Sequence, residues 1–464
     1  MKSKLLFFIF ILLIPVPFYG QRDHTQELID LLNEGRCFDA MNYREQYHDS
    51  IPDDPFFTLF YQYHMAWFFN KPDSAARYLS EMVRQENEAV WGLNVGRFRG
   101  ELLKIYDTSQ QYEKAIELCD STMDYLIRNP FDMPEDLREK DIEFVRNVQS
   151  AIAEKAKILP RMRVVREEIY SKIPLCPVDT GLIHFEAEYN GKPTKTLFDT
   201  GLTHYFFLEK SLAGTLGVKI YDLQQDSIEL VNGSPVRAIT GIFDSIRIGP
   251  VCLYNIPALI FLDKFTVNIS DSLLSNPDIK TQLEPAFDSM QIFMGLAAMK
   301  LIGRFELDQD KNTMTIPPIP STDTVQMSHN IFFDKNNLYV NLKINDQDCN
   351  LVFDTGMQNT FLSLNDRFYE KNKQYICLDK ETPKEPIYTA TFSGECPTLD
   401  YEMVKDADIV LNDKTIPSRT NEVLIKPDVF THLETFDGSA GSLFFRRPGQ
   451  KIILDLVNMR VEGK

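Results

Sequence analysis

The spacing of apolar residues changes near residue 175, and this change divides the chain into two regions. Before it, apolar residues recur every three or four positions, as at Leu28, Leu31 and Leu32, a spacing that predicts amphipathic helices. After it, apolar and polar residues alternate within β-rich runs separated by turn signals such as Asn-Gly. We therefore expect a multidomain α+β protein, with an all-α domain over residues 21–175 and all-β structure over residues 180–464.

Three segments of the helical region resemble one another. Each has an apolar helix end, a short polar turn and a small alanine in the next helix, and the alanines are Ala40, Ala76 and Ala115. Their spacing is close to the period of about 34 residues found in tetratricopeptide-like helical hairpins. An irregular helical bundle packed on the downstream domain fits the same pattern, so both interpretations stay open. Such an array binds a protein partner or braces a neighbouring domain.

The first twenty residues have the pattern of a secretory signal peptide. Lys2 and Lys4 precede the short apolar core Leu5–Pro17, and a polar chain begins at Gln21. We expect residues 1–20 to be removed and the protein to be exported, to the periplasm or the extracellular space; a retained N-terminal helix is the alternative. No apolar run reaches the ~20 residues that a membrane-spanning helix needs, so no transmembrane anchor is predicted.

The β-rich region contains an internal repeat of two copies. The stretch 183–207 aligns without a gap on 338–362, and in both an alternating strand, a turn and a second strand lead to Asp-Thr-Gly. The ends of the units also match, because 292–316 and 439–461 each run from a glycine through a short apolar helical piece into a strand, a turn and a return strand. We expect two equivalent lobes. They span residues 180–320 and 330–464.

The duplicated unit resembles the pepsin and retropepsin type of aspartic protease, in its bacterial secreted form. In that family each lobe has a strand that ends in Asp-Thr-Gly, and an apolar-apolar-Gly element crosses behind the catalytic loop. The counterparts of this element here are 293–295 (Phe-Met-Gly) and, less closely, 439–441 (Ser-Ala-Gly). The resemblance implies a bilobal all-β acid-protease fold over residues 180–464, and it covers none of the helical region.

Asp199 and Asp354 are the candidate catalytic residues. Two carboxyl groups a few ångströms apart cannot both ionise, so they hold one proton between them. The ionised partner takes a proton from water while the other protonates the peptide carbonyl oxygen. The resemblance also assigns site-supporting roles to Thr200, Gly201, Thr355 and Gly356. The threonine hydroxyls would bond to the opposite loop, and the glycines would permit a tight turn and leave space for the water.

Two further features follow from the resemblance. A mobile hairpin, the flap, is expected over residues 231–242, where Gly233 and Gly241 suit a mobile hairpin. Leu202 and Met357 follow the two motifs, at positions where the family commonly has Ser, Thr or Ala. Without a hydroxyl beside each carboxylate the pair should keep its proton to higher pH, so we expect a mildly acidic to near-neutral optimum.

Charge and cysteine content narrow the choice of partners. The chain has 49 Lys and Arg against 67 Asp and Glu, and a formal charge of −18 repels phosphate backbones, so no nucleic-acid partner is predicted. The cysteines form no Cys-x-x-Cys pair and no zinc-type cluster with the histidines, so no metal and no cofactor are predicted. A bridge between Cys377 and Cys396 would suit a hairpin, whereas free buried thiols are expected for most cysteines. His184 and His204, near the first motif, are interpreted as strand or surface histidines.

The sequence thus predicts a secreted aspartic-type endopeptidase, a hydrolase that cleaves peptide or protein substrates with a two-aspartate dyad and an activated water. The alternative is a catalytically weak or inactive acid-protease fold that binds a peptide or protein partner together with the helical domain. Pairing of each lobe with another chain, as in retropepsin dimers, is unnecessary because one chain carries both lobes.

Overall fold

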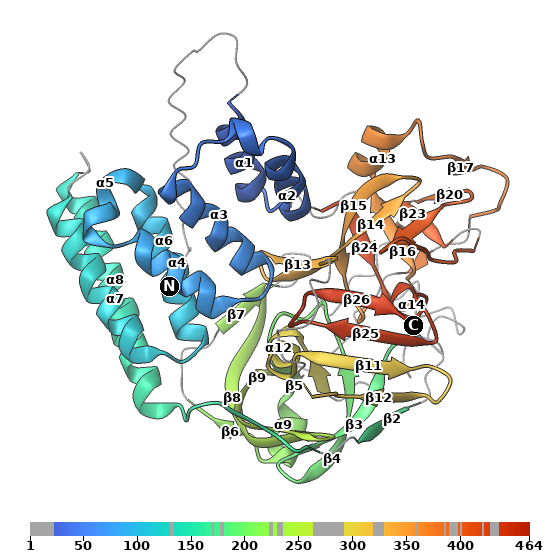
Figure 1. Cartoon of the computed structure of the whole chain (residues 1–464). Helices are drawn as coiled ribbons and strands as arrows, with labels where there is room; N and C mark the ends of the chain where they lie inside the picture. The colour runs from blue at the N-terminus through green and yellow to red at the C-terminus, as the bar shows by residue number, and fades with distance from the viewer. Residues whose placement is uncertain are drawn as a thin grey trace. The chain divides into compact units, whose positions relative to one another are not determined.

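The computed structural model has two compact units, Met1–Asp53 and Asp54–Lys464. The residues that the structure describes are 23–129, 134–168, 171–176, 181–221, 226–229, 235–262, 292–318, 329–358, 360–384, 387–388, 398–399, 401–419, 422–426 and 436–464. The first unit contains α1 (His24–Asn33), α2 (Cys37–Gln46) and the short helix η1 (His48–Ser50). The second unit begins with helices and continues with strands, so the α+β layout is confirmed (Figure 1).

One group of helices in the second unit precedes its strands. They are α3 (Pro55–Phe68), α4 (Pro72–Met82), η2 (Gln85–Asn87), α5 (Glu88–Trp91), α6 (Asn94–Thr108), α7 (Tyr112–Arg128) and α8 (Glu135–Ile158). With α1 and α2, the described helices form three hairpins: α1–α2, α3–α4 and α6–α7. The two helices of each hairpin contact each other, and α6 also contacts α4 of the preceding hairpin.

The three helical hairpins share one turn geometry. The middle residue of each turn is left-handed: Gly35 has φ 76°, Asn70 has φ 53° and Gln110 has φ 54°. The backbone N–H of the next residue closes each turn on a carbonyl in the preceding helix, at 2.9 Å for Arg36, 2.8 Å for Lys71 and 2.8 Å for Gln111. This is how helices commonly end. The repeated turn gives the three hairpins a common local structure despite their different sequences.

The small residue after each turn is Ala40, Ala75 or Ala115. Each is fully buried, and its backbone N–H donates to the carbonyl of the residue that follows the turn, at 2.9, 2.9 and 3.0 Å. The sequence pattern points to Ala76 at this place in the second hairpin, and the structure corrects it by one residue. Both neighbours are alanine, and only the position of the left-handed residue Asn70 identifies Ala75 as the counterpart.

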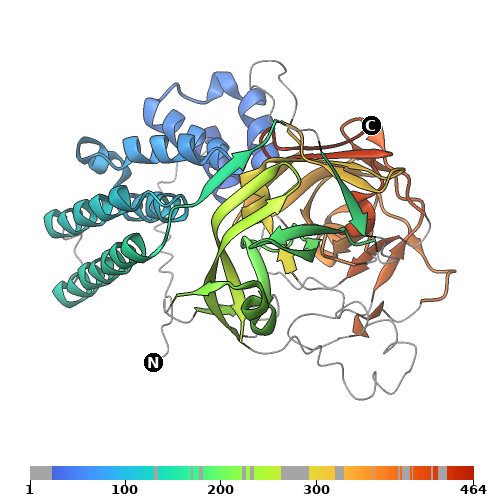
Figure 2. The same cartoon turned by 90° about the horizontal axis from the view of Figure 1, so that it is seen from below.

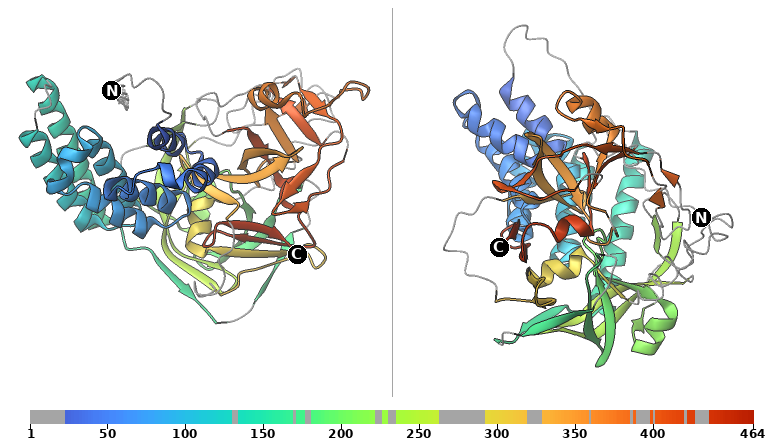
Figure 3. Two further views of the ribbon diagram at one scale, coloured as in Figure 1. Left: turned by 45° about the horizontal axis from the view of Figure 1, so that its top comes forward. Right: turned by 90° about the vertical axis from the view of Figure 1, so that its right-hand side faces the viewer.

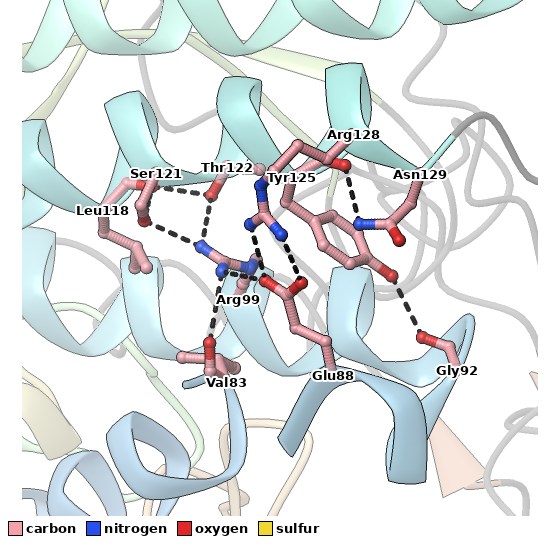
Figure 4. A network of polar contacts seen from close by, with 10 residues as sticks. All are labelled: Val83, Glu88, Gly92, Arg99, Leu118, Ser121, Thr122, Tyr125, Arg128 and Asn129. Atoms are coloured by element: carbon pink, nitrogen blue, oxygen red, sulfur yellow. Dashed lines mark hydrogen bonds and ion pairs between the residues drawn. The ribbon is translucent and has the colours of Figure 1, made fainter. Parts of the chain in front are cut away.

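A buried ion-pair network ties α5 to α6 and α7 (Figure 4). The Glu88 carboxylate accepts a hydrogen bond from Arg99 at 3.2 Å and two from Arg128 at 3.0 and 3.1 Å. Arg99 also donates to the Val83 carbonyl at 3.1 Å and to the Ser121 hydroxyl at 2.7 Å. Glu88 and Arg99 are both buried, and buried charges persist only when they are paired in this way. The network therefore fixes the short α5 turn against the longer helices.

Helix α8 packs along α7 at the edge of this array (Figure 2). Ile152 is buried in a cluster with residues of α7, and Gln149 donates to the Asp120 carboxylate at 2.7 Å. Lys155 forms an ion pair with Asp107 of α6 at 2.7 Å. The contacts thus anchor one side of α8 on two preceding helices.

The first sheet system contains the first copy of the repeat. Its central strands are β3 (His184–Tyr189), β4 (Lys192–Phe198), β5 (Phe206–Glu209), β9 (Val251–Phe261) and β10 (Ile292–Met294). Strand β4 pairs with β3 antiparallel and with β10 parallel, β10 pairs with β5 antiparallel, and β5 pairs with β9 parallel. Strand β9 forms a long hairpin with β8 (Pro235–Ile248). The short elements α9 (Lys210–Leu216), β6 (Lys219–Ile220) and β7 (Asp226–Glu229) complete this part.

The second sheet system repeats the pairing pattern. Its central strands are β14 (Asn337–Ile344), β15 (Gln347–Phe353), β16 (Leu362–Asn365), β23 (Val423–Lys426) and β24 (Gly438–Ala440). Strand β15 pairs with β14 antiparallel and with β24 parallel, β24 pairs with β16 antiparallel, and β16 pairs with β23 parallel. The predicted duplication of the sequence therefore corresponds to a duplication of strand pairing.

Smaller elements accompany these central strands. In chain order they are β13 (Ile331–Asp334), α13 (Asp366–Asn372), β17 (Leu378–Asp379), β18 (Ile387–Tyr388), β19 (Thr398–Leu399), β20 (Glu402–Val404), β21 (Ile409–Leu411) and β22 (Lys414–Thr415).

The turns of the two hairpins that lead to Asp-Thr-Gly also match. Asn190 and Gly191 join β3 to β4 with φ of 50° and 79°, and Asn345 and Asp346 join β14 to β15 with φ of 49° and 63°. Two-residue hairpin loops favour such residues because both central positions need a positive φ. The loops set the same register in both copies, so the two motifs leave their strands at equivalent places.

Each copy ends in a short helix and a hairpin. These elements are α12 (Leu296–Ile302), β11 (Arg304–Asp308) and β12 (Thr313–Thr315) in the first copy, and α14 (Ser442–Phe445), β25 (Lys451–Asp455) and β26 (Arg460–Gly463) in the second. Strands β25 and β11 pair antiparallel, so both closing hairpins belong to one sheet (Figures 1 and 3). Strand β2 (Lys172–Cys176) extends this sheet beyond β12, and β1 (Arg163–Arg166) pairs with β9.

The turn of the second helical hairpin contacts the β-rich part of the same unit. The Phe69 ring stacks on His329 with ring centroids 4.0 Å apart, and the Asn70 side chain donates to the Leu456 carbonyl at 2.9 Å. The backbone N–H of Leu456 in turn donates to the Gly303 carbonyl at 2.7 Å. The α3–α4 hairpin is therefore attached to the turn that joins β25 to β26.

Candidate active site

The two Asp-Thr-Gly motifs begin where β4 and β15 end. The backbone N–H of Asp199 donates to the Met294 carbonyl at 3.0 Å, and that of Asp354 donates to the Ala440 carbonyl at 2.9 Å. Strands β10 and β24, which supply the first two residues of the predicted apolar-apolar-Gly elements, thus lie directly beside the motifs. The loops that carry the two aspartates are held in the same way in both copies.

The glycine of each crossing element is required by close packing. A Cβ atom on Gly295 would lie 2.5 Å from the Leu202 carbonyl oxygen, and one on Gly441 would lie 2.6 Å from the Thr360 carbonyl oxygen. Real Cβ atoms do not approach backbone oxygens this closely. The residue after the glycine also bonds to the motif loop: the backbone N–H of Leu296 donates to the Leu202 carbonyl at 2.7 Å. A glycine is therefore needed wherever this element crosses behind a loop.

Thr200 and Thr355 cross-link the two motif loops. The Thr200 hydroxyl accepts the backbone N–H of Thr355 at 2.9 Å and donates to the Phe353 carbonyl at 2.6 Å. The Thr355 hydroxyl accepts the backbone N–H of Thr200 at 3.0 Å and donates to the Phe198 carbonyl at 2.9 Å. Both threonines are buried, so these reciprocal bonds are shielded from water.

The cross-link places the two carboxyl groups together. Gly201 donates its backbone N–H to the Asp199 carboxylate at 2.9 Å, and Gly356 donates to that of Asp354 at 2.8 Å. A Cβ on Gly201 would lie 2.5 Å from an oxygen of Asp354, and one on Gly356 would lie 2.5 Å from an oxygen of Asp199. The two carboxyl groups lie close enough for each to affect the pKa of the other. Each glycine thus leaves the room that the opposite carboxyl group occupies.

Both carboxyl groups hold their protons more tightly than exposed aspartates do. Burial raises the pKa of Asp199 well above its usual range, and the neighbouring Asp354 charge raises it further. Burial also raises the pKa of Asp354, against backbone N–H groups of Gly356, Met357 and Gly201 that lower it. The pair titrates as one unit in which the first proton is lost at a different pH from the second. One shared proton is the form that general acid–base chemistry with water needs.

The residues after the motifs differ in their surroundings. Leu202 packs against a buried cluster of the first copy that includes Leu197, Phe207 and Phe293. Its side chain therefore contributes to the core beneath the loop. Met357 is half-buried. The carboxyl groups accept hydrogen bonds from backbone N–H groups of the loops. These N–H groups stand in for the missing hydroxyl, and the sequence gives no sign of them.

The predicted flap lies only partly within the described residues. Strands β7 and β8 form an antiparallel hairpin, with Glu229 opposite Pro235, and Gly233 in the intervening loop lies outside the described residues. Gly241 lies further along β8, between Ile220 of β6 and Ala258 of β9. A Cβ there would lie 2.5 Å from the Ile260 side chain, so Gly241 permits close packing within the sheet.

A small hairpin occupies the corresponding place of the second copy. Strands β18 and β19 pair antiparallel, with Tyr388 opposite Thr398, and the residues between them lie outside the described part. Each copy therefore has a hairpin after its motif. In the chain it lies between β5 and β9 in the first copy and between β16 and β23 in the second.

His184 is buried in β3, the strand that pairs with β4. Among the described residues neither of its ring nitrogens has a hydrogen-bond partner. Burial, together with the charges of Lys195 and Arg446, lowers the pKa of His184 to about 4. His204 is exposed beside the first motif, where its ring bonds the Thr203 hydroxyl at 3.3 Å.

Other predicted features are described in part. No three His, Cys, Asp or Glu side chains are arranged to hold a metal ion within the described ranges. In the same ranges no helix is both long and apolar enough to cross a membrane. Cys377 is exposed, and Cys396, its predicted partner, lies outside the described residues, as do residues 1–20.

Two comparisons with known proteins found a likeness to part of this chain. Residues 185–276 match a family model described as aspartyl protease, and this segment contains Asp199 and the β7–β8 hairpin. A solved structure described as a retropepsin-like aspartic protease from Rickettsia conorii is 19% identical to this chain. The alignment covers 34% of this chain and 96% of that one, with a TM-score of 0.23. None of the curated proteins compared matches this chain.

Proposed function

We propose that this protein is an aspartic-type endopeptidase and that Asp199 and Asp354 are its catalytic residues. The observation that carries the proposal is the pairing of these two carboxyl groups by the reciprocal bonds of Thr200 and Thr355. A single Asp-Thr-Gly loop is a common strand-end turn. Here the threonines alone join the two loops, so the fold does not need two carboxyl groups beside each other, and their pairing points to a chemical role. The match of residues 185–276 to the aspartyl protease model supports the same reaction.

The mechanism follows from the shared proton. The ionised carboxylate takes a proton from a water molecule held between the two groups, and the water oxygen attacks the peptide carbonyl carbon. The protonated partner gives its proton to the carbonyl oxygen, so no charge builds up on that oxygen. On collapse of the tetrahedral intermediate, the carboxyl group that took the proton from water gives it to the leaving nitrogen, and the other carboxylate takes a proton from a hydroxyl of the intermediate. The C–N bond breaks, the amine and the new carboxyl group are released, and the pair is again singly protonated. Because desolvation raises the pKa of both carboxyl groups, the singly protonated pair extends to higher pH than for exposed aspartates.

The arrangement of the remaining chain is part of the proposal. Residues 180–320 and 330–464 would be the two lobes of an acid protease, with peptide or protein substrates bound between them beneath the β7–β8 hairpin. Residues 21–175 would be a tetratricopeptide-like domain that binds a protein partner, and residues 1–20 a signal peptide that directs export. The repeated strand pairing of the two copies supports the first assignment, and the repeated helical turn supports the second.

The experiment compares hydrolysis of an unfolded protein substrate by the purified chain and by two variants. Asp199→Asn and Asp354→Asn should each reduce kcat/KM by at least a thousandfold, because each change removes one half of the shared-proton unit. Asp346→Asn is the matched control: it makes the same change in the turn of the hairpin that leads to Asp354, where Asn tolerates the left-handed φ of 63°. A pepstatin-like transition-state mimic should inhibit, and a chelator should not.

Two outcomes would contradict the assignment. Near wild-type hydrolysis by either dyad variant would show that the carboxylates are not catalytic. Absence of hydrolysis by the wild type, together with measurable peptide binding that survives in both dyad variants, would favour the alternative of a peptide-binding module with the same fold.

A further inference from the structure

The outer side of α8 carries an apolar stripe that is exposed to solvent. Leu137, Phe144 and Ile158 are 45%, 58% and 41% exposed, and Ala151 is exposed between them. These residues are spaced seven apart in sequence, which places them along one side of the helix with a slow left-handed drift. At a rise of about 1.5 Å per residue the stripe is roughly 30 Å long.

This stripe lies on a different side of α8 from the one that packs on α7. Val145, Val148, Gln149 and Ile152 make the contacts with α7, and at about 100° per residue they lie roughly 40° to 140° around the helix from Phe144, all in the same direction. Helical arrays normally end in a repeat whose outer face is polar, because each unit leaves an apolar face for the next one. The chain continues from α8 into β1, so α8 is the last helix of the array in the described part of the chain. The array therefore ends on a helix with an uncovered apolar side.

We propose that α8 pairs antiparallel with α8 of a second copy of this chain. An antiparallel pair centred between Asn147 and Val148 brings Phe144 against Ala151 of the second copy, and Leu137 against Ile158. Each large side chain then faces a small or complementary one, as close packing requires. A parallel pair would instead stack Phe144 on Phe144 and Ala151 on Ala151, which leaves a crowded layer beside a void.

The charges that flank the stripe fit the same arrangement. Lys140 and Glu154 lie on one flank, and Asp141 and Lys155 lie on the other. In an antiparallel pair related by a twofold axis, residues of the same flank face each other. Lys140 then faces Glu154 of the second copy, and Asp141 faces Lys155, which also pairs with Asp107 of its own chain. The surface is complementary to itself in both size and charge.

The other occupants of such a surface fit less well. Helices that lie on membranes have a polar face rich in Lys and Arg, whereas acidic and basic residues alternate along α8 and the whole chain carries a formal charge of −18. Two helices of this length bury less area than a standard interface, so we expect a dissociation constant on the order of 10 μM.

Sedimentation velocity of the purified full chain over a range from about 1 to 200 μM tests the proposal against the expected constant. The wild type should change from monomer to dimer across this range. Phe144→Glu should weaken the dimer at least tenfold, whereas Arg146→Glu, an exposed change on the far side of α8, should not. Circular dichroism should show unchanged helix content in both variants, since neither side chain is buried.

A charge exchange tests the antiparallel register. Lys140→Glu alone and Glu154→Lys alone should each weaken the dimer, because like charges then face each other. The double variant should restore it, because each copy again presents opposite charges. In a parallel pair the double variant would set the carboxylate introduced at position 140 against that of Asp141, and the dimer would not be restored. A chain that stays monomeric at the highest concentration, a dimer insensitive to Phe144→Glu, or a double variant without recovery would overturn the proposal.

Discussion

Thr200 and Thr355 complete each other's hydrogen bonds: each hydroxyl accepts the backbone N–H of the other threonine and donates to the carbonyl two residues before it. Neither loop satisfies these buried groups alone. The positions of the two carboxyl groups are consequently fixed by one another, through short bonds between the loops. Loops joined in this way hold the dyad through their own main chain and two short side chains.

The first prediction concerns this cross-link. Thr200→Val should lower the free energy of unfolding by about 2–4 kcal/mol, because it leaves the buried Thr355 N–H and the Phe353 carbonyl without partners. It should also lower kcat/KM at least tenfold, since the carboxyl groups lose their alignment. Thr200→Ser keeps the hydroxyl and should cost less than about 1 kcal/mol. Urea unfolding measures the first effect; equal stability of the Val and Ser variants would contradict the role of the hydroxyl.

The second prediction concerns the room between the carboxyl groups. Gly356→Ala should abolish peptidase activity, because its Cβ would lie 2.5 Å from an oxygen of Asp199 and would push the two carboxyl groups apart. Gly214→Ala in α9 is the matched control, because nothing lies within 4 Å of a Cβ at that position. Steady-state hydrolysis of the same substrate measures both variants. Full activity of Gly356→Ala would mean that the loops are farther apart than the structure has them.

The third prediction is that the dyad weakens the fold at neutral pH. The pKa of Asp199 is raised in the folded protein, so the folded state binds more protons than the unfolded state once pH exceeds the unfolded pKa of about 3.9. The stabilising contribution is therefore complete in acid and is lost as pH rises through the folded pKa. Asp199→Asn removes this titration. The variant should be more stable than the wild type at pH 7, and this difference in the free energy of unfolding should be smaller at pH 4. A stability difference that does not change with pH would contradict this interpretation.

The fourth prediction concerns acid stability and has the opposite sign. The pKa of His184 is lowered to about 4 in the folded protein, and the unfolded state takes up its proton near pH 6.5. Stability that is present above pH 6.5 should therefore be lost as pH falls toward 4, by up to about 3 kcal/mol for this residue. Burial lowers the pKa of His64 to about 3, so it contributes in the same direction.

His184→Met tests this contribution. Methionine fills an irregular buried space and does not titrate, so unfolding free energies of this variant should fall less between pH 7 and pH 4.5 than those of the wild type. His48→Gln is the control, since His48 is exposed in the first unit. If the free energy of unfolding of His184→Met fell with pH as steeply as that of the wild type, the acid sensitivity would belong to other groups. Under the proposed function, the raised pKa values of Asp199 and Asp354 and the loss of stability in acid together predict an optimum in mildly acidic to neutral solution.

The two motif loops could be predicted from the sequence because their local geometry requires short, repeated patterns. Asp-Thr-Gly at the end of an alternating strand fixes the aspartate, the hydroxyl and the close approach within three positions. The same holds for the hairpin turns at Asn190 and Asn345, where positive φ restricts the residue type. Local chemistry of this kind leaves a signal wherever it occurs.

Features that depend on distant residues leave no such signal. The pairing of Glu88 with Arg99 and Arg128 joins helices whose approach is set by the whole array. The residue type of Gly241 suits a mobile hairpin, whereas its neighbours across β6 and β9 decide its place in the sheet. Spacing alone cannot separate Ala75 from Ala76, because the two residues are identical and only the backbone turn distinguishes them.

The pairing of β25 with β11 has a consequence for when the dyad can form. Asp199 emerges early during synthesis, but the strand that supports the Asp354 loop and the hairpin that joins the two copies in one sheet lie far downstream, ending at Gly463. Chains are made from the N-terminus, and pairings between distant segments form slowly. A ribosome-bound chain therefore lacks the last strands that hold the two carboxyl groups together, and under the proposed function hydrolysis would not begin until translation has passed Gly463.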